Sequence, residues 1–500
     1  MRRAGIDQST KRSRIKMTSS PDKETEVQTS DQDPKSVKGL IDSQYETRVN
    51  ASSGYWLCIL LPFAFIINNI RYPKSSSAFD YKMTTIVSFG LCLQSIYIFT
   101  CILESRSKLL RICLISIPGI CTSLFIQIIL NQTTAVSVIW GLTTTLTYNY
   151  VYFKLLKTLP RSFTYGEASV AAQGLILFLM NGFLRIPHFV NNPPMTYMGQ
   201  MNAIMITALS CLIVTLVLLY ILKPLRNPVA FYPLMVALAV AVCTVPVTRQ
   251  VPVVTLWNFI VSDLRRVAII VFYIGLVGAT IAAVNWRLQK DEKASTAVRK
   301  LFHLLVVFVY IPGLLYQCTF LYIASGVALA VMTVIETVRV IKVPPLYEAL
   351  EKSFDVFADE KDCGNIALTP FYLLIGCSLP MWISPHACVT IDNALHNVIL
   401  LMAGVLTVGI GDTAASTIGL AFGKHKLPNS TKSVEGTIAN MVAQTLAVFL
   451  LVHFGYIHLN PISKLTTGFA IIFSSLIEAF TDQVDNLVLP LIFYITCIIT

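Results

Sequence analysis

The sequence predicts an all-α protein, a polytopic bundle of transmembrane helices. Hydrophobic residues make up 55% of its 500 residues and charged residues only 13%, whereas soluble domains carry about 25% charged residues. Its mean hydropathy is +0.66. Apolar runs recur from Gly54 to Thr500, and each is on the order of 20 residues long, enough to cross the hydrocarbon core of a bilayer. We therefore expect roughly 13 to 15 spans.

The formal net charge of +11 does not indicate nucleic acid as a partner. The lysines and arginines lie in short loops beside apolar runs, as Arg265, Arg266 and Lys300 do, and basic loops of this kind stay in the cytosol. The twelve cysteines form no CxxC pair and no metal-binding spacing. We interpret most of them as small core residues, and the fold is expected to need no disulfide.

Three regions follow from the hydropathy pattern. Residues 1–53 are polar and lack the apolar stretch of a signal peptide, so we expect a disordered cytosolic tail there. Residues 54–290 form an N-terminal transmembrane region of roughly eight spans, which can supply a lipid groove. Its apolar runs include 83–103, 109–130, 201–222 and 267–284. Residues 291–500 form a C-terminal transmembrane region that we expect to carry the chemistry.

The N-terminal region has few polar interruptions, and the clearest lies at 159–173. Thr164 and Glu167 have the Ser/Thr-x-x-Glu spacing of a capping box ahead of an apolar run. We favour this structural role for the pair over a ligand-binding role.

From residue 291 onward, charged loops alternate with pairs of apolar runs. The pairs are 302–314 with 319–338, 366–383 with 397–410, and 438–457 with 467–480. Two crossings separate each polar loop from the next. The loops at 299–300, 340–365, 411–437 and 481–486 are therefore expected on one face of the membrane, and their basic content predicts the cytosolic face.

The segment 411–437, GDTAASTIGLAFGKHKLPNSTKSVEGT, places glycines, an acid, hydroxyls and lysines inside an apolar chain. This composition is typical of a phosphate site. Backbone N–H groups at a glycine and at a helix start coordinate phosphate oxygens, lysines neutralise them, and a carboxylate holds the accompanying divalent cation. The candidate nucleotide-binding residues are Gly411, Asp412, Thr413, Lys424, Lys426, Lys432, Ser433, Glu435, Gly436 and Thr437.

Each part of this segment also has a purely structural interpretation. Small residues recur at every fourth position from Gly411 to Gly423, so in a helix they form one face for close packing. Asp412 can cap a helix, the lysines can be an exposed cytosolic cluster, and Glu435 and Thr437 can cap the next span. Neither a Walker A loop nor a Rossmann fingerprint fits the spacing, so a site here is of another kind.

A second set of charged residues lies in the neighbouring loops. Glu478, Asp482 and Asp485 have the i, i+4, i+7 spacing that aligns carboxylates on one helical face. Such acids repel one another unless they share a cation, although a solvated helix end gives the same pattern. Arg299 and His303 are i, i+4 neighbours entering a span; Arg299 can be a topology anchor, whereas His303 lies one turn deeper.

In these segments the sequence resembles the dolichol kinase family of polytopic enzymes. The resemblance rests on RKLFH at 299–303, FADEKDCGNIALTPFYLLIGCSLPMW at 357–382, GDTAAS through KSVEGT at 411–437, and EAFTDQVDNLVLP at 478–490. SFTYGEA at 162–168 is similar to a shorter family segment. The CTP-dependent phosphatidate cytidylyltransferases share a similar GD...G...K...EG arrangement, but the segments at 359–382 and 478–490 favour the kinase. Ser433 stands where many relatives have threonine, and it keeps the hydroxyl.

The resemblance implies an enzyme of the endoplasmic reticulum membrane with a cytosolic active site. It would use CTP and a divalent cation, Mg²⁺ or Ca²⁺, to phosphorylate dolichol or another polyprenol for protein glycosylation. On this basis we expect Asp412, Asp482 and Asp485 to organise metal and phosphates, the lysines to bind the triphosphate, and Arg299 and His303 to orient a phosphate or the hydroxyl. Asp482 is the expected general base, because it can lie at the membrane surface where the lipid hydroxyl arrives.

Two other functions remain as alternatives. A cytidylyltransferase would make a CDP-lipid and release pyrophosphate, and a transporter would also combine many spans with intramembrane polar residues. Labelled CTP distinguishes the first from a kinase, because a kinase passes the γ-phosphate to the lipid and a cytidylyltransferase passes the α-phosphate.

Overall fold

The computed structural model describes residues 45–49, 51–74, 76–103, 114–288, 296–357, 364–385, 387–388, 398–428, 430 and 432–499, without the side chains at 287–288, 296–299 and 355–357. All of these residues belong to one compact unit, Gly39–Thr500. The structure is 81% helical, and its described residues contain no β-strand beyond a single isolated bridge. The predicted all-α class is confirmed.

The N-terminal region contains ten α- and 3₁₀-helices longer than four residues among its described residues. They are η2 (Tyr55–Ile59), α1 (Leu60–Arg71), α2 (Phe79–Leu103), α4 (Ile117–Leu130), α5 (Thr134–Thr158), α6 (Tyr165–Asn191), α7 (Tyr197–Ile221), α8 (Pro228–Thr244), α9 (Pro252–Val261) and α10 (Leu264–Leu288).

The C-terminal region continues the same pattern with one irregular helix. Its elements are α11 (Thr296–Tyr316), α12 (Cys318–Val340), α13 (Tyr347–Phe357), α14 (Thr369–Ile383), α16 (Val398–Leu401), the π-helix η5 (Val405–Asp412), α17 (Thr413–Phe422), α18 (Val434–His453), α19 (Pro461–Phe480) and α20 (Asp485–Ile499).

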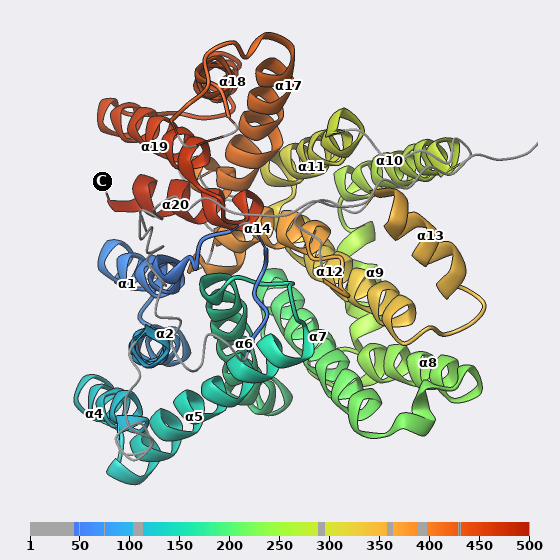
Figure 1. The fold of residues 1–500 in the computed structure, drawn as a ribbon. Coiled ribbons are helices and arrows are strands. Elements are labelled where there is room, and N and C mark those ends of the chain that lie inside the picture. The colour runs from blue at the N-terminus through green and yellow to red at the C-terminus, as the bar shows by residue number, and fades with distance from the viewer. Residues whose placement is uncertain are drawn as a thin grey trace, which may run out of the picture. The chain divides into compact units, whose positions relative to one another are not determined.

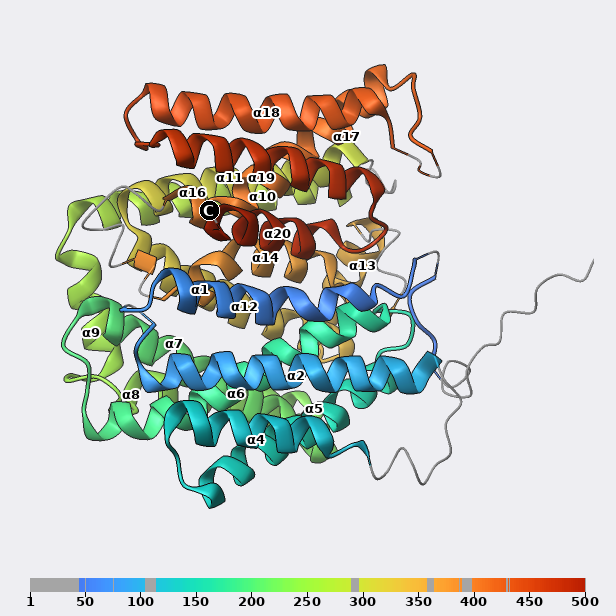
Figure 2. The ribbon, with the colours of Figure 1, turned by 90° about the vertical axis from the view of Figure 1, so that its left-hand side faces the viewer.

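Eight helices of the described chain are long and apolar enough to cross a membrane, by length and composition, and seven more are apolar but only 10–17 residues long. The eight long helices are fewer than the expected 13 to 15 spans, and the shorter ones include α9, whose ten residues are too few to cross a bilayer, so that number stays a prediction. The helices α18, α19, α20, α1, α2 and α4 run side by side in that order (Figure 2). The first and last spans of the chain, α1 and α20, are therefore neighbours (Figure 1).

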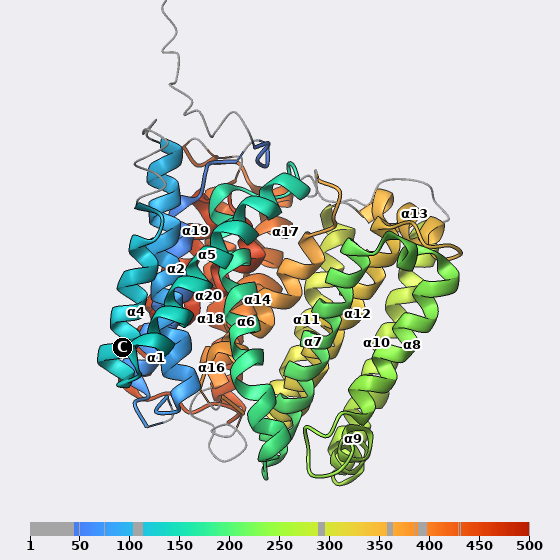
Figure 3. The ribbon, with the colours of Figure 1, turned by 90° about the horizontal axis from the view of Figure 1, so that it is seen from below.

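The helices have two ends, which we call the loop end and the far end. The loop end is where α6, α11, α18 and α20 begin, and the far end is where α7 and α12 begin; α13 lies at the former and α9 at the latter (Figure 3). Lys300 forms an ion pair with Asp412, and Lys432 with Glu478. Three of the four predicted loops are thereby joined at the loop end, as the count of crossings predicted.

The fourth predicted loop, 340–365, lies at the same end, because Gly364 packs closely against the start of α6. A side chain at Gly364 would collide with Ser162, which precedes the N-terminus of α6. The capping box predicted there is present: Thr164 accepts from the backbone N–H of Glu167, and Glu167 accepts from that of Thr164. The structural role favoured from the sequence is confirmed for this pair.

A disulfide joins Cys318 and Cys388, which are 70 residues apart in sequence. The sequence predicted no need for a disulfide, because no short Cys spacing signals this pairing. The two residues meet at the far end, where α12 begins and the chain has passed the end of α14. Eight other cysteines among the described residues are free.

Ordered structure begins before the boundary expected at residue 53. Arg48 is buried, and its backbone N–H donates to the carbonyl of Phe163 over 2.9 Å. Ser53 accepts from the backbone N–H of Gly166 over 2.9 Å. Residues 45–49 and 51–53 are therefore part of the folded unit rather than of a disordered tail, because buried and hydrogen-bonded partners on α6 hold them.

We predict that Gly376→Ala destabilises the fold by about 1–3 kcal/mol, the range for overpacking a core. Gly376 of α14 lies so close to α20 that a methyl group would collide with the backbone oxygen of Asn486. The matched control is Gly275→Ala on α10, where a methyl group meets nothing within 4 Å. Thermal unfolding in detergent measures both; equal unfolding temperatures for the two variants would contradict the packing.

Candidate active site

A cavity of about 220 Å³ lies at the loop end, where α17, α18, α19 and α20 meet. Its walls come from four separate stretches of the C-terminal region. The lining residues are Asp412, Ala415, Ser416, Gly419, Leu420, Lys426, Lys432, Ser433, Gly436, Thr437, Glu478 and Asp485.

Asp412 lies at the junction between the π-helix η5 and α17. The helical backbone continues through this junction, with φ −67° and ψ −30° at Asp412, and its side chain makes no capping bond. The expected free helix start at 411–413 is therefore absent. The carboxylate of Asp412, which is 5% exposed, instead pairs with Lys300 and lies 3.4 Å from Nε2 of His303.

Gly411 near the end of η5 and Gly419 of α17 serve close packing against α18. A Cβ atom at Gly411 would collide with Asn440, and one at Gly419 would lie 3.7 Å from the Cα of Gly436. The face of small residues predicted from the four-residue repeat is present. Gly411 itself contributes to this packing and does not line the cavity.

The chain between α17 and α18 folds back on itself and supplies the lysines. A bridge joins Lys426 to Ser433, and Ser433 caps α18 by accepting from the N–H of Gly436 over 3.2 Å. Lys432 reaches across to α19, where its ammonium donates to the carboxylate and the carbonyl of Glu478. Lys426 and Lys432 thus both line one cavity.

The row of acids predicted at 478, 482 and 485 does not form one helical face. The helix α19 ends at Phe480, Thr481 is extended with ψ 140°, and α20 begins at Asp485. Because the helical repeat stops between them, Glu478 and Asp485 line the cavity and Asp482 does not. The carboxylate of Asp482 accepts from the N–H and the hydroxyl of Ser52 over 2.6 and 2.7 Å.

These hydrogen bonds also change the acidity of Asp482. Partial burial acts to raise the pKa of its carboxyl, but the hydrogen bonds from the side chain and backbone of Ser52, together with that from the side chain of Gln483, outweigh burial and hold the pKa below its ordinary value. A carboxylate with a lowered pKa and engaged oxygens is a poor proton acceptor. Asp482 was expected at the site as metal ligand and general base, but its carboxylate lies outside the cavity and is bonded to Ser52.

The cavity gathers carboxylates and ammonium groups in similar numbers. Asp412, Glu478 and Asp485 line it, and Lys426 and Lys432 face them. Carboxylate oxygens are the donors that Mg²⁺ and Ca²⁺ prefer. In the part of the chain that is described, however, no three His, Cys, Asp or Glu side chains converge closely enough to hold a metal ion as they stand.

A larger cavity, of about 590 Å³, lies at the far end. It contains an ion pair between Asp80 and Arg185 and is walled by aromatic side chains such as Trp382. None of the predicted site residues lines it. The smaller cavity at the loop end is therefore the candidate active site.

The structure brings together part of the predicted set. Asp412, Lys426, Lys432, Ser433, Gly436, Thr437 and Asp485 line the cavity, with His303 beside Asp412. Gly411, Thr413, Lys424, Glu435 and Asp482 do not line it. The carboxylate of Glu435 instead pairs with His425 over 2.6 Å. The side chain of Arg299 is outside the described residues.

Two contributors were not selected from the sequence. Lys300 was interpreted with Arg299 as a topology anchor, yet it lies three residues before His303, on the same helical face, and pairs with Asp412. Glu478 was noted among the acids but not chosen. Its position inside an apolar helix was the available signal, because a carboxylate within a span is costly unless it is paired.

We predict that Lys300→Met destabilises the protein by about 3–5 kcal/mol, because it leaves the buried Asp412 carboxylate without the ammonium group that pairs with it. Adding Asp412→Asn should restore most of the lost stability. Thermal unfolding in detergent measures the single and double variants, with Lys424→Met, an exposed lysine of the same region, as control. Additive losses in the double variant would contradict the pairing.

Comparisons with known proteins agree on one family. The family model described as "Dolichol kinase" matches residues 106–372, a stretch that ends before Asp412. The chain is 30% identical to "Dolichol kinase" of Bos taurus over 471 residues, covering 89% of this chain and 86% of that protein. It is 30% identical to "Dolichol kinase" of Homo sapiens with the same coverage, and 32% identical to "Dolichol kinase EVAN" of Arabidopsis thaliana over 49% of this chain and 43% of that protein. No solved structure matches. The protein thus belongs to the dolichol kinase family.

Proposed function

We propose that this protein is a dolichol kinase that transfers the γ-phosphoryl group of CTP to the terminal hydroxyl of dolichol, giving dolichyl phosphate and CDP for protein glycosylation. Family membership supports the kinase activity and the lipid acceptor. The single observation that carries the site assignment is the cavity at the loop end, where two lysines and three carboxylates face one another beside apolar surface.

The lysines and hydroxyls of the cavity suit the triphosphate. Lys426 and Lys432 supply positive charge, and Ser433 and Thr437 supply hydroxyls at the start of α18. A helix N-terminus favours anions, because its first N–H groups and its dipole point toward them. We assign the β- and γ-phosphates to this corner of the cavity.

The carboxylates suit the divalent cation that accompanies a nucleotide. Asp412, Glu478 and Asp485 present hard oxygen donors to the same cavity. Lys300 and Lys432 now neutralise two of these acids. These three carboxylates would hold the cation of a bound metal–nucleotide complex, and Lys300 and Lys432 would then be released from their ion pairs to contact the phosphates. The cation would neutralise charge that develops on the transferred group.

The transfer itself depends mainly on alignment and charge neutralisation. The lipid oxygen forms a bond to the γ-phosphorus, the bond between that phosphorus and the β–γ bridging oxygen breaks, and CDP leaves with the electron pair. A carboxylate of the cavity accepts the hydroxyl proton. His303 beside Asp412 is proposed to orient the acceptor hydroxyl.

The polyprenyl tail can remain in the bilayer during the reaction. Leu420 lines the cavity and is 71% exposed, and α18 and α19 carry rows of exposed apolar side chains such as Phe449 and Phe469. Side chains of this kind on a span face lipid. We propose that dolichol approaches along this surface and that only its hydroxyl enters the polar cavity.

We propose that the loop end faces the cytosol and the far end faces the lumen of the endoplasmic reticulum. Basic residues at the loop end, such as Lys300, Lys424 and Lys426, favour the cytosolic side. Arg265 and Arg266, expected on the same side from the sequence, lie instead at the start of α10 next to α9, at the far end (Figure 3). The disulfide Cys318–Cys388 at the far end fits an oxidising compartment. The donor CTP is available on the cytosolic side under this orientation.

The purified protein with dolichol and γ-labelled CTP is predicted to yield labelled lipid, and removal of divalent cations with a chelator is predicted to stop the reaction until Mg²⁺ or Ca²⁺ is restored. The same assay with α-labelled CTP is the control and should leave the lipid unlabelled. Label from the α-position in the lipid would identify a cytidylyltransferase instead.

Lys432→Ala is predicted to lower kcat/KM for CTP by about 100-fold or more, because it removes a charge aimed at the phosphates. Lys424→Ala removes an equal charge from an exposed position outside the cavity and should change kcat/KM by less than about threefold. Initial rates of lipid phosphorylation measure both. Equal effects of the two substitutions would indicate a diffuse attraction and remove the cavity assignment.

A further inference from the structure

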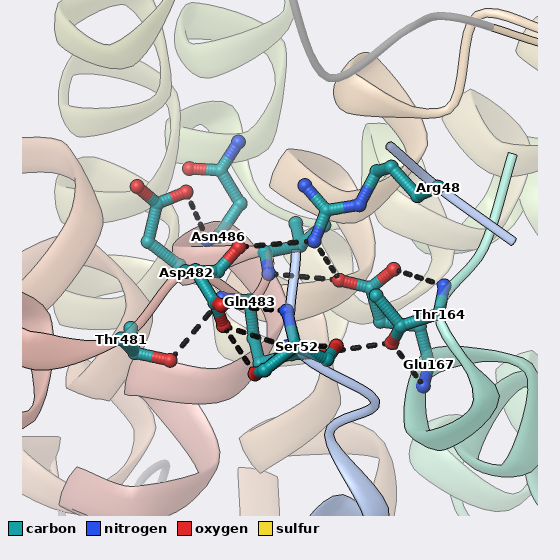
Figure 4. Close-up of polar contacts among 10 residues, drawn as sticks. Arg48, Ser52, Thr164, Glu167, Thr481, Asp482, Gln483 and Asn486 are labelled. Atoms are coloured by element: carbon teal, nitrogen blue, oxygen red, sulfur yellow. Dashed lines mark hydrogen bonds and ion pairs between the residues drawn. The ribbon is translucent and has the colours of Figure 1, made fainter. Parts of the chain in front are cut away.

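An extended segment of the chain crosses the loop end directly before the first helix. We call residues 45–49 and 51–53 the strap. Its backbone is fixed to the connection between α5 and α6, since Arg161 donates to the carbonyl of Glu46 over 2.7 Å and Gly166 donates to that of Ser53 over 2.9 Å. The strap thereby lies between the start of α6 and the turn at 481–484 (Figure 4).

A buried ion pair lies at the centre of this crossing. The guanidinium of Arg48 donates to Glu167 over 2.7 Å, and the two side chains are 5% and 0% exposed. The same nitrogen of Arg48 donates to the carbonyl of Asp482 over 3.0 Å. The carboxylate of Glu167 also accepts from the N–H of Val484 over 3.0 Å, in addition to capping α6. One carboxylate therefore joins three stretches of chain.

A second group of hydrogen bonds repeats the connection from the other side of the turn. Ser52 donates to Asp482 through both its N–H and its hydroxyl. Gln483 donates to the carbonyl of Ser52 over 2.9 Å and accepts from the hydroxyl of Thr164 over 2.8 Å. Each residue from 482 to 484 is thus bonded to the strap or to the start of α6 (Figure 4).

The turn held in this way connects the two acids that line the cavity from the C-terminal helices. Glu478 lies two residues before the end of α19, and Asp485 is the first residue of α20. A shift of the turn would move both carboxylates together. Buried ion pairs contribute little net stability compared with apolar packing, but their fixed geometry sets the orientation of the groups that they join. Small misplacements of groups at a reacting centre lower the reaction rate strongly.

We propose that the strap and Glu167 are positioning elements of the active site: Arg48, Ser52 and Glu167 hold the 481–484 turn so that Glu478 and Asp485 point into the cavity. This inference rests on the proposed function, because it concerns the metal–nucleotide site of that reaction. Under this proposal the strap acts together with the C-terminal region that carries the active site, although Ser52 lies 430 residues before Asp482 in sequence.

The test uses the full-length protein in the γ-labelled CTP assay, with Arg48→Met and Ser52→Ala as the two probes. Both are expected to lower kcat about 10- to 100-fold and to raise the concentration of Mg²⁺ needed for half-maximal rate by about tenfold. The KM for dolichol is expected to stay within about threefold of the starting value, because the lipid surface on α18 and α19 is not touched. Arg48→Lys, which keeps the charge, should recover part of the lost rate.

Glu46→Gln is the matched control. It lies in the same strap and removes one partner of the Arg161–Glu46 ion pair, whose side chains are 58% and 63% exposed, so rate and Mg²⁺ requirement should be unchanged. Ser52→Ala removes a single exposed hydroxyl and is expected to fold. It therefore still tests the proposal if Arg48→Met fails to fold.

The possible results separate the two proposals. If the starting protein labels dolichol but Ser52→Ala and Arg48→Met keep its kcat and Mg²⁺ requirement, or lose rate only in proportion to the folded fraction, the positioning role is overturned and the kinase assignment stands. If the starting protein leaves dolichol unlabelled, both proposals fall.

Discussion

Charge compensation at the loop end is the constraint on which the rest of the structure depends. Three carboxylates that are almost fully buried, those of Glu167, Asp412 and Glu478, lie within or next to apolar helices. Each forms an ion pair with a basic side chain from a distant part of the chain: Arg48, Lys300 and Lys432, respectively. A buried carboxylate without such a partner would be strongly destabilising, so these pairs determine which helices can meet at this end and in what register.

The helices themselves are brought close enough for this by small residues. The face that carries Gly411 of η5 and Gly419 of α17 packs against α18, and Gly376 allows α14 to approach the backbone of α20. In a bilayer, lipid tails offer helices as apolar a surrounding as other helices do, so association depends on close packing and polar contacts rather than on the hydrophobic effect. The candidate active site is the space that remains where such contacts end and charged loops begin.

The same arrangement suits a reaction between a water-soluble nucleotide and a lipid alcohol. The lysines and carboxylates of the candidate site lie at the loop end, whereas the outer surfaces of α18 and α19 expose apolar side chains. A phosphoryl donor can then stay in water and a long polyprenol in the bilayer while their reacting groups meet at the cavity. The paired acids and lysines also keep the cavity close to electrical neutrality, which lowers the cost of burying its charges.

The amino-acid sequence by itself determined the all-α membrane architecture, the presence of the loops on one side and the capping box at Thr164. These depend on local composition and on the length of apolar runs, and helices satisfy their own backbone hydrogen bonds within a bilayer. It also selected Asp412, Lys432 and Asp485, which line one cavity in the structure. Only the tertiary structure decided that Asp482 turns toward Ser52 and away from the cavity, because α19 ends at Phe480 and the helical repeat on which the prediction relied stops there. Likewise the pairing of Lys300 with Asp412, 112 residues apart, and of Cys318 with Cys388 depends on how helices pack across the chain, and no local pattern encodes a contact between residues so far apart.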